Sequence, residues 1–222
     1  MKERSSSDLS DISPVGLAYR EIKRRILDRI YEPGQKLSEV RLTADLNLGR
    51  SPIRTALGRL RGEDWIEITP QSGTYVKGLS SKEISEIVEL RLILEPEVAR
   101  MAAGRTNLQR LKKLQHRLEE YRAHFKANSQ LDVYFDLDLE IHMTIYEAAG
   151  NALMSNILIG LLDKVRWIQQ GSVGSSARRE AVLLELSELL GALERQNAEE
   201  AAKLMHNHIR KMAEFRGIAF SE

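Results

Sequence analysis

Residues 38–65 constrain the fold of this chain more than any other stretch. A short run with apolar positions at helical spacing ends in a tight Asn47-Leu48-Gly49 connection, and a second run follows. In the second run the apolar positions are Ile53, Ala56, Leu57 and Leu60, and the arginines on the opposite side are Arg50, Arg54 and Arg61. Two short helices joined by a glycine turn, the second bearing arginines, are typical of a helix-turn-helix. We therefore predict that the second helix binds DNA.

The pattern changes from helical spacing to alternation after residue 60. Residues 65–69 and 74–77 alternate apolar and polar side chains around a Pro70-Gln71-Ser72-Gly73 connection, which predicts a β-hairpin. A helix-turn-helix followed by a hairpin is a winged helix. The alternative is a generic small α+β domain, which does not explain why arginines gather on the exposed side of the second helix.

An earlier helix completes the predicted winged-helix domain, which spans residues 15–78. Its apolar positions, predicted to form a buried stripe, are Leu17, Ile22, Ile26 and Ile30. Pro33-Gly34 ends this helix in a turn. Residues 1–14 are predicted to be a disordered tip, and residues 79–81 a short linker.

The rest of the chain, residues 82–220, contains no strand pattern. Its helical segments are predicted at about 81–103, 107–127, 131–149, 152–170, 177–196 and 198–217. Connections this short imply antiparallel neighbours, so we predict a mainly α protein with a C-terminal antiparallel six-helix bundle. Pro96 falls inside the first segment and is predicted to kink or interrupt it.

Composition excludes several classes of protein. With no cysteine among 222 residues, the chain has no disulfides or thiolate metal sites, which fits a reducing cytoplasm. No apolar run approaches the roughly 20 residues of a membrane helix, and the first residues lack the apolar core of a signal peptide. Residues 1–79 hold 14 basic and 11 acidic side chains, and the remainder holds 19 and 21. We expect a cytoplasmic protein with a basic DNA-binding end and no membrane association.

Three polar residues occupy core-facing positions of the predicted bundle. Asp138 and His142, at i and i+4, lie on the apolar stripe of the third bundle helix, and His208 lies on that of the last. A buried carboxylate needs a partner because its desolvation costs several kcal/mol. Two imidazoles and a carboxylate suit a divalent metal such as zinc, or a pocket for a ligand. A hydrogen bond from one His to Asp138 within an apolar core is the alternative.

The segment Leu42–Leu57, LTADLNLGRSPIRTAL, with Gly73-Thr74-Tyr75-Val76, resembles the winged-helix signature of bacterial GntR-type transcription regulators. The resemblance covers about residues 15–78. This chain departs from the pattern at Gly49, where the family usually has Ser, at Thr55, where it has Glu, and at Asp64, where it has Gly. Asp64 is expected to strain the turn into the wing.

The resemblance also implies how the domain contacts DNA. We expect Arg50 and Arg54, one turn apart, to contact base edges and nearby phosphates. Ser51 and Arg61 are expected to contact the DNA backbone. Gly73 is expected to let the wing tip approach the minor groove.

The bundle resembles the ligand-binding FCD domain of the FadR subfamily of GntR regulators at Ile87–Ala103 and at Asp138-Leu139-Glu140-Ile141-His142. Six helices rather than seven resemble its smaller, VanR-like branch. Such members commonly hold a metal with one Asp and three His and bind a small carboxylate beside it. The matching ligands are Asp138, His142 and His208, but the position of the third His is Leu186, which cannot coordinate a metal. A metal on three ligands and a metal-free pocket that binds an anion both remain open.

Arg91 is a further candidate, because the resemblance places an arginine there close to the pocket. Its guanidinium would bind an effector carboxylate in a bidentate manner. The alternative is a surface ion pair with Glu95, one helical turn away.

We therefore predict a ligand-responsive bacterial transcription regulator, a homodimeric repressor of a catabolic operon that a small organic-acid effector releases from a palindromic operator. One alternative is a metal-dependent helical-bundle enzyme, although the chain has no Glu-x-x-His pair, nucleophile elbow or phosphate loop. Another is an architectural DNA-binding protein without an effector, which would need a more basic chain.

Overall fold

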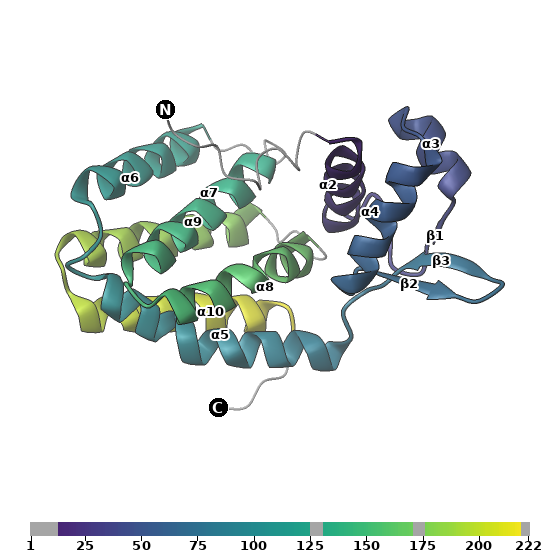
Figure 1. Ribbon diagram of the computed structural model, residues 1–222. Coiled ribbons are helices and arrows are strands. Elements are labelled where there is room, and N and C mark those ends of the chain that lie inside the picture. The colour runs from purple at the N-terminus through teal and green to yellow at the C-terminus, as the bar shows by residue number, and fades with distance from the viewer. Residues whose placement is uncertain (1–12, 125–130, 171–175, 219–222) are drawn as a thin grey trace. The chain divides into compact units, whose positions relative to one another are not determined.

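The computed structural model describes residues 13–124, 131–170 and 176–218 (Figure 1). The chain divides into two compact units, Met1–Leu79 and Ser80–Glu222. Most of the tip predicted at residues 1–14 lies outside the described residues. Its last residue, Pro14, instead begins the first described helix, because Ser13 caps that helix by accepting the backbone N–H of Gly16 at 3.0 Å.

The described residues of the first unit form three helices and a small antiparallel sheet. The elements are α2 (Pro14–Leu27), β1 (Lys36–Leu37), α3 (Glu39–Leu46), α4 (Arg50–Gly62), β2 (Ile66–Thr69) and β3 (Gly73–Val76). Strand β3 lies between the other two, with Glu67 opposite Tyr75 and Lys36 opposite the same Tyr75. The winged helix-turn-helix predicted from the sequence is confirmed.

Local backbone chemistry sets the ends of the two helices of the motif. Ser38 caps α3, and Asn47 ends it in the left-handed conformation at φ 51°. Gly49 is the N-cap of α4, and Pro52 lies in the first turn, where its missing N–H is not needed. The apolar face of α4 is buried, as predicted, at Ile53, Ala56, Leu57 and Leu60.

Two details of this unit differ from the prediction. Leu17 and Ile30 are exposed, whereas Ile22 and Ile26 are buried. Leu17 lies five residues before Ile22, too far around the helix to share its face, and Ile30 lies beyond the end of α2. Strand β1 was not predicted, because two residues are too short to show alternation.

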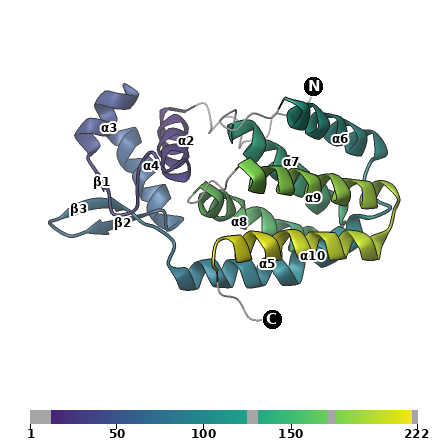
Figure 2. The same cartoon turned by 180° about the vertical axis from the view of Figure 1, so that it is seen from behind.

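The described residues of the second unit form six helices, as predicted. The helices are α5 (Ser81–Ala102), α6 (Leu108–Ala123), α7 (Leu131–Ala148), α8 (Ala152–Gln170), α9 (Ser176–Glu194) and α10 (Ala198–Phe215). Helix α5 packs against α7, α8 and α10, and α9 packs against α6 and α10 (Figures 1 and 2). The shared core is built from fully buried residues such as Val98, Leu118, Ile141, Leu186 and Met205.

Helix α5 continues through Pro96, so the predicted interruption is wrong. A proline ring removes one intrahelical hydrogen bond, but Val98 and Ala99 just beyond it are fully buried in the core. Packing of the helix on three neighbours outweighs the lost bond. A kink at Pro96 stays a prediction. None of the helices in the described residues is long and apolar enough to cross a membrane.

Candidate functional site

The exposed face of α4 carries the arginines singled out in the sequence. Arg50, Arg54 and Arg61 are all exposed, and their spacings of four and seven residues place them along one side of the helix. Ser51 is exposed in the first turn of α4. The geometry therefore presents a basic ridge opposite the apolar face that packs on the rest of the unit.

Gly73 opens β3 at the tip of the hairpin with φ 136°, a conformation that side chains other than glycine's rarely adopt. A Cβ at this position would also lie 2.6 Å from Lys36 Cε. The wing turn therefore requires glycine here. Asp64, in the turn between α4 and β2, also has a positive φ, of 66°. This backbone conformation agrees with the strain expected from the sequence at this position.

One contact on the basic ridge was missed by sequence reasoning. Arg54 Nε donates a hydrogen bond to Glu39 Oε2, at 2.8 Å, across the turn that joins α3 to α4. Fifteen residues separate the two, so no spacing rule within one helix connects them. The pair forms because α3 packs against α4 and brings Glu39, at its start, beside Arg54.

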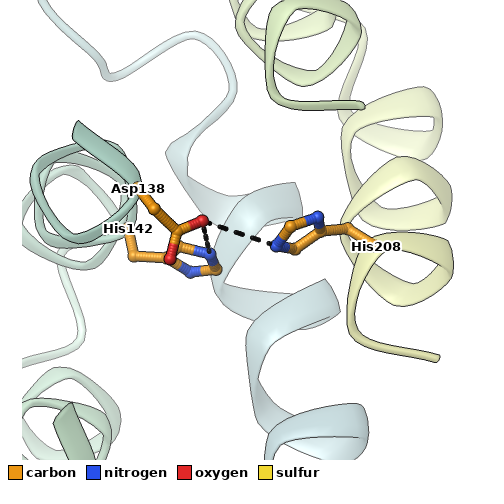
Figure 3. Close-up of side chains that lie close together, drawn as sticks. All are labelled: Asp138, His142 and His208. Carbon is orange, nitrogen blue, oxygen red and sulfur yellow. Dashed lines mark ion pairs between the residues drawn. The ribbon is translucent and has the colours of Figure 1, made fainter. Parts of the chain in front are cut away.

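The second unit brings Asp138, His142 and His208 together in its interior (Figure 3). His142 Nε2 and His208 Nε2 each lie 3.8 Å from Asp138 Oδ1. One ligand atom from each residue lies within 4.8 Å of the others, and all three side chains are buried. Helix α7 supplies Asp138 and His142 one turn apart, and α10 supplies His208 from the facing side.

Each member of this trio is oriented by a carboxylate or an amide that contacts the atom facing away from the other two members. His142 Nδ1 lies 2.8 Å from Glu95 Oε2, and His208 Nδ1 lies 3.0 Å from Glu185 Oε2. Gln169 Nε2 donates to Asp138 Oδ2 at 2.9 Å. Both imidazoles therefore turn Nε2 toward the same oxygen of Asp138, which is the arrangement in which outer carboxylates support metal-binding histidines.

This donor set fits a divalent metal. Within the described residues, His142 Nε2 and Asp138 Oδ1 are buried atoms without a hydrogen-bond partner. Two donors 3.8 Å apart can both reach an ion at metal–ligand distances of about 2 Å. Two imidazoles and a carboxylate are ligands for zinc and similar ions, and they leave at least one coordination position open.

Leu186 is fully buried, as its stripe on α9 predicts. Val182, one turn earlier on that stripe, lines the same cavity as Asp138 and His208. An isobutyl side chain has no donor atom, so α9 contributes no ligand here. The side chain of α9 that contacts the trio is Glu185, whose carboxylate lies beside His208 Nδ1.

Arg91 and Glu95 form an ion pair, but inside the bundle rather than on its surface, which corrects the surface pair considered above. The two residues are only 3% and 0% exposed. Burial would raise the pKa of Glu95, but Arg91 and His142 outweigh it and hold this pKa well below its ordinary value. Burial would lower the pKa of His142, but Glu95 and Asp138 outweigh it and raise this pKa.

A cavity of about 40 Å³ adjoins the trio, and a second of about 20 Å³ lies beside it. Both are lined by Arg91, Asp138 and Gln169. The larger one is also lined by three further arginines, namely Arg178, Arg179 and Arg216. Glu95 pairs with Arg91 and Glu185 pairs with Arg178, so three carboxylates, Asp138 included, face the four guanidinium groups. The remaining positive charge makes this space suitable for a small anion.

Glu95, Glu185 and Gln169 were not recognised from the sequence as parts of the pocket. The signal for Glu95 was its one-turn spacing from Arg91, which indicated a pair but not its burial. Glu185 precedes the inward-facing Leu186, and Gln169 lies at the end of α8, so neither falls on a predicted core stripe.

Comparison with known proteins places both units. Residues 16–76 match the family model of bacterial regulatory proteins of the gntR family, and residues 86–211 match that of the FCD domain. The HTH-type transcriptional repressor RspR of Escherichia coli is 27% identical over 199 residues, covering 88% of this chain and 86% of that protein. The Nta operon transcriptional regulator of Aminobacter aminovorans is 26% identical over 186 residues, covering 82% and 84%. The structure of McbR/YncC from E. coli superposes with a TM-score of 0.74 at 16% identity, covering 92% of this chain and 97% of that one, and shares the fold.

Proposed function

This chain belongs to the GntR family of bacterial transcription regulators and carries an FCD domain, and from that premise we propose that it represses a catabolic operon in response to a small organic acid. The name of the related repressor RspR supports the direction of control. The six helices that the described residues of the second unit form support a place in the VanR-like branch of the FadR subfamily. A protein acting on the chromosome of a bacterium works in the cytoplasm.

In this proposal α4 enters the major groove of operator DNA. Arg50 and Arg54 contact base edges and nearby phosphates, because they lie early on the exposed side of α4. Ser51 and Arg61 contact the DNA backbone. Gly73 keeps the wing tip slim enough to approach the minor groove.

The pocket of the second unit binds the effector. Asp138, His142 and His208 would hold a divalent metal, which would supply a positive charge for an anionic ligand. Arg91 lines the adjoining cavities and adds a guanidinium for the same carboxylate, while Glu95 keeps that arginine in place. Effector binding changes operator affinity because the effector binds one arrangement of the protein more tightly than another.

Two copies of the chain associate through the helical units, so that two winged helices meet a palindromic site. Exposed apolar side chains on the neighbouring helices α5 and α8 support this association. The observation that carries the proposal as a whole is the pairing of an arginine-bearing recognition helix with a buried polar trio in a separate unit.

The test is selection of DNA sites from a random pool with the full chain, followed by footprinting. A short symmetric protected site is expected, whereas an architectural protein would protect none. Arg54→Ala is expected to weaken binding to that site by about 1–3 kcal/mol in a gel-shift titration. Arg110→Ala, which removes an exposed arginine from α6, is the control and is expected to bind like the parent. Equal affinity of the Arg54→Ala variant and the parent would contradict the placement of α4.

A metal-dependent enzyme is the alternative for the same trio. Turnover of a substrate by the purified protein without DNA would support it. The family membership and the fold favour regulation instead.

A further inference from the structure

The ion pair between Glu39 and Arg54 lies on the surface that faces DNA in the function proposed above. Glu39 is the first residue of α3, and Arg54 is the fifth residue of α4. Their side chains meet at 2.8 Å although that of Arg54 remains 68% exposed. An exposed pair of this kind contributes little to stability. Its position at the front of the motif therefore points to another role.

The atom through which Arg54 is held decides what the rest of its guanidinium can do. Glu39 accepts the N–H of Nε, on the inner edge of the planar group. The two terminal nitrogens, Nη1 and Nη2, keep donors on the outer end. Those are parallel donors of the type that reads O6 and N7 of a guanine in the major groove.

The neighbouring arginines are held differently. Arg59 lies with its guanidinium 3.7 Å from the centre of the Tyr19 ring and pairs with Glu63 at 3.2 Å, so it is bound to its own unit's surface. Within the described residues, Arg50 and Arg61 form no ion pair. Arg54 is thus both exposed and fixed in direction, since a carboxylate from the other helix of the motif holds its inner edge.

We propose that Glu39 is a specificity-determining positioning residue that aims Arg54 at a guanine of the operator. This inference rests on the proposed function, because it requires α4 in the major groove. Holding the guanidinium beforehand reduces the rotamer freedom that Arg54 loses on binding the correct base. The carboxylate at the start of α3 also repels phosphates, but this repulsion acts on DNA of every sequence, so only the positioning of Arg54 adds a preference for one site.

Alternative roles for Glu39 predict different behaviour. A carboxylate at the first position of a helix stabilises the helix through its dipole, and it changes the net charge of the unit. Either role would persist with any carboxylate at this position. The positioning of Arg54 would not persist with aspartate, because the shorter side chain does not reach Arg54 Nε.

The experiment measures base preference with the full chain. The parent protein first selects its site from random DNA, and Kd values are then measured for this site, for sites with each guanine replaced, and for random-sequence duplexes. The variants are Glu39→Gln, Glu39→Asp, Arg54→Ala and the double Glu39→Gln/Arg54→Ala. The control, Glu67→Gln, removes an equal charge from the exposed side of β2.

The preference is the ratio of the Kd for a site with one guanine replaced to the Kd for the parent's site. At one guanine, this ratio is expected to be at least about 5-fold smaller for both Glu39 variants than for the parent, which is the lower end of the discrimination that one bidentate contact provides. The double variant is expected to match Arg54→Ala there, since Glu39 acts through Arg54. Glu67→Gln is expected to keep the full preference. Thermal unfolding of each variant verifies that the unit remains folded.

Two results would overturn the inference while leaving the proposed function intact. One is a Glu39→Asp variant with the parent's preference, which would assign Glu39 to charge or to the helix dipole. The other is a Glu39→Gln variant that changes affinity for all DNA equally, as Glu67→Gln would. If the parent selects no site, or Arg54→Ala binds every duplex like the parent, the proposed placement of α4 fails and the inference fails with it.

Discussion

Each histidine of the buried trio has a distinct task for each ring nitrogen. Glu95 and Glu185 occupy the Nδ1 sides of His142 and His208, so the Nε2 atoms are left for Asp138 or for an ion between the three residues. Neutral imidazole with its Nδ1–H donated to a carboxylate has a free Nε2 lone pair. Removing Asp138 therefore removes the one group on which both imidazoles converge.

Asp138→Ala is expected to abolish the response to metal and effector while leaving DNA binding without effector intact. At a metal concentration of about 100 times Kd, the parent gains about 2.7 kcal/mol of unfolding free energy, and the variant gains none. Thermal unfolding with zinc or manganese, alone and with small carboxylates, measures this. His206→Ala, which removes an exposed histidine from the same helix, serves as the control. Equal stabilisation of the Asp138→Ala variant and the parent would refute the pocket.

Glu95 neutralises Arg91 in the core, so its replacement has a predictable cost. Glu95→Gln leaves a buried guanidinium without its counter-charge, and we expect a loss of about 3–5 kcal/mol of unfolding free energy. Chemical denaturation at pH 7 in the presence of a chelator measures it. Glu188→Gln, on the exposed side of α9, is expected to change little.

The pH dependence of stability follows from the lowered pKa of Glu95. Since the folded-state pKa lies below the unfolded value of about 4.3, its contribution is present above that pH and is lost as the pH falls toward the folded value. The parent should therefore lose stability between about pH 5 and pH 3, and Glu95→Gln should lose less over the same range. Parallel losses in the two proteins would show that other carboxyl groups dominate.

At the scale of helices and strands, the periodicity of apolar residues predicted the elements whose pattern lies within one continuous segment of the chain. Long apolar stripes predicted the six helices described in the second unit, because each of these helices buries one continuous face. Ile30 was predicted to belong to the first helix, but that helix ends at Leu27. The spacing of apolar residues alone does not show where a helix ends. The contact of Glu95 with His142 and the pairs made by Glu185 and Glu39 were missed because the partners come from other helices, and only the packing of the helices brings them together.

The turn between α4 and β2 offers a test of backbone strain. Asp64 has a positive φ and forms an exposed ion pair with Lys77. Asp64→Gly removes a conformational cost of about 1 kcal/mol and loses a pair that contributes about 0–1 kcal/mol, so stability should rise by up to about 1 kcal/mol. Asp64→Ala should fall below the parent, because it keeps the strain and loses the pair.

The stability of both variants is measured by thermal unfolding in a Trp167→Phe background, with the fluorescence of the adjacent Trp65 as the signal. This background leaves a single tryptophan, in the first unit. A glycine variant no more stable than the alanine variant would show that the turn is not strained.

At the scale of the whole molecule, the proposed regulator needs two DNA-binding units on one symmetric operator. Helices α5 and α8 pack against each other, and each carries an isoleucine or leucine with well over half of its surface exposed. Ile93 is 70% exposed and Leu153 is 72% exposed, and Leu90 and Ile157 on the same helices are also exposed. Gly160 of α8 has open space where a Cβ would lie, so nothing within the unit requires glycine inside this helix. Contact with a second copy would bury these apolar side chains.

The double variant Ile93→Glu/Leu153→Glu is therefore expected to dissociate the dimer. Burying an isoleucine or leucine side chain contributes about 1.5–3 kcal/mol, and two per copy contribute from both sides. The dimer dissociation constant should rise at least about 100-fold in sedimentation equilibrium. Affinity for the full palindrome should fall, and affinity for a half-site should stay unchanged. Leu108→Glu/Leu184→Glu, at exposed positions of α6 and α9, is the matched control and should stay dimeric. If the control dissociates and the α5/α8 variant does not, the copies meet through the α6/α9 side of the bundle instead.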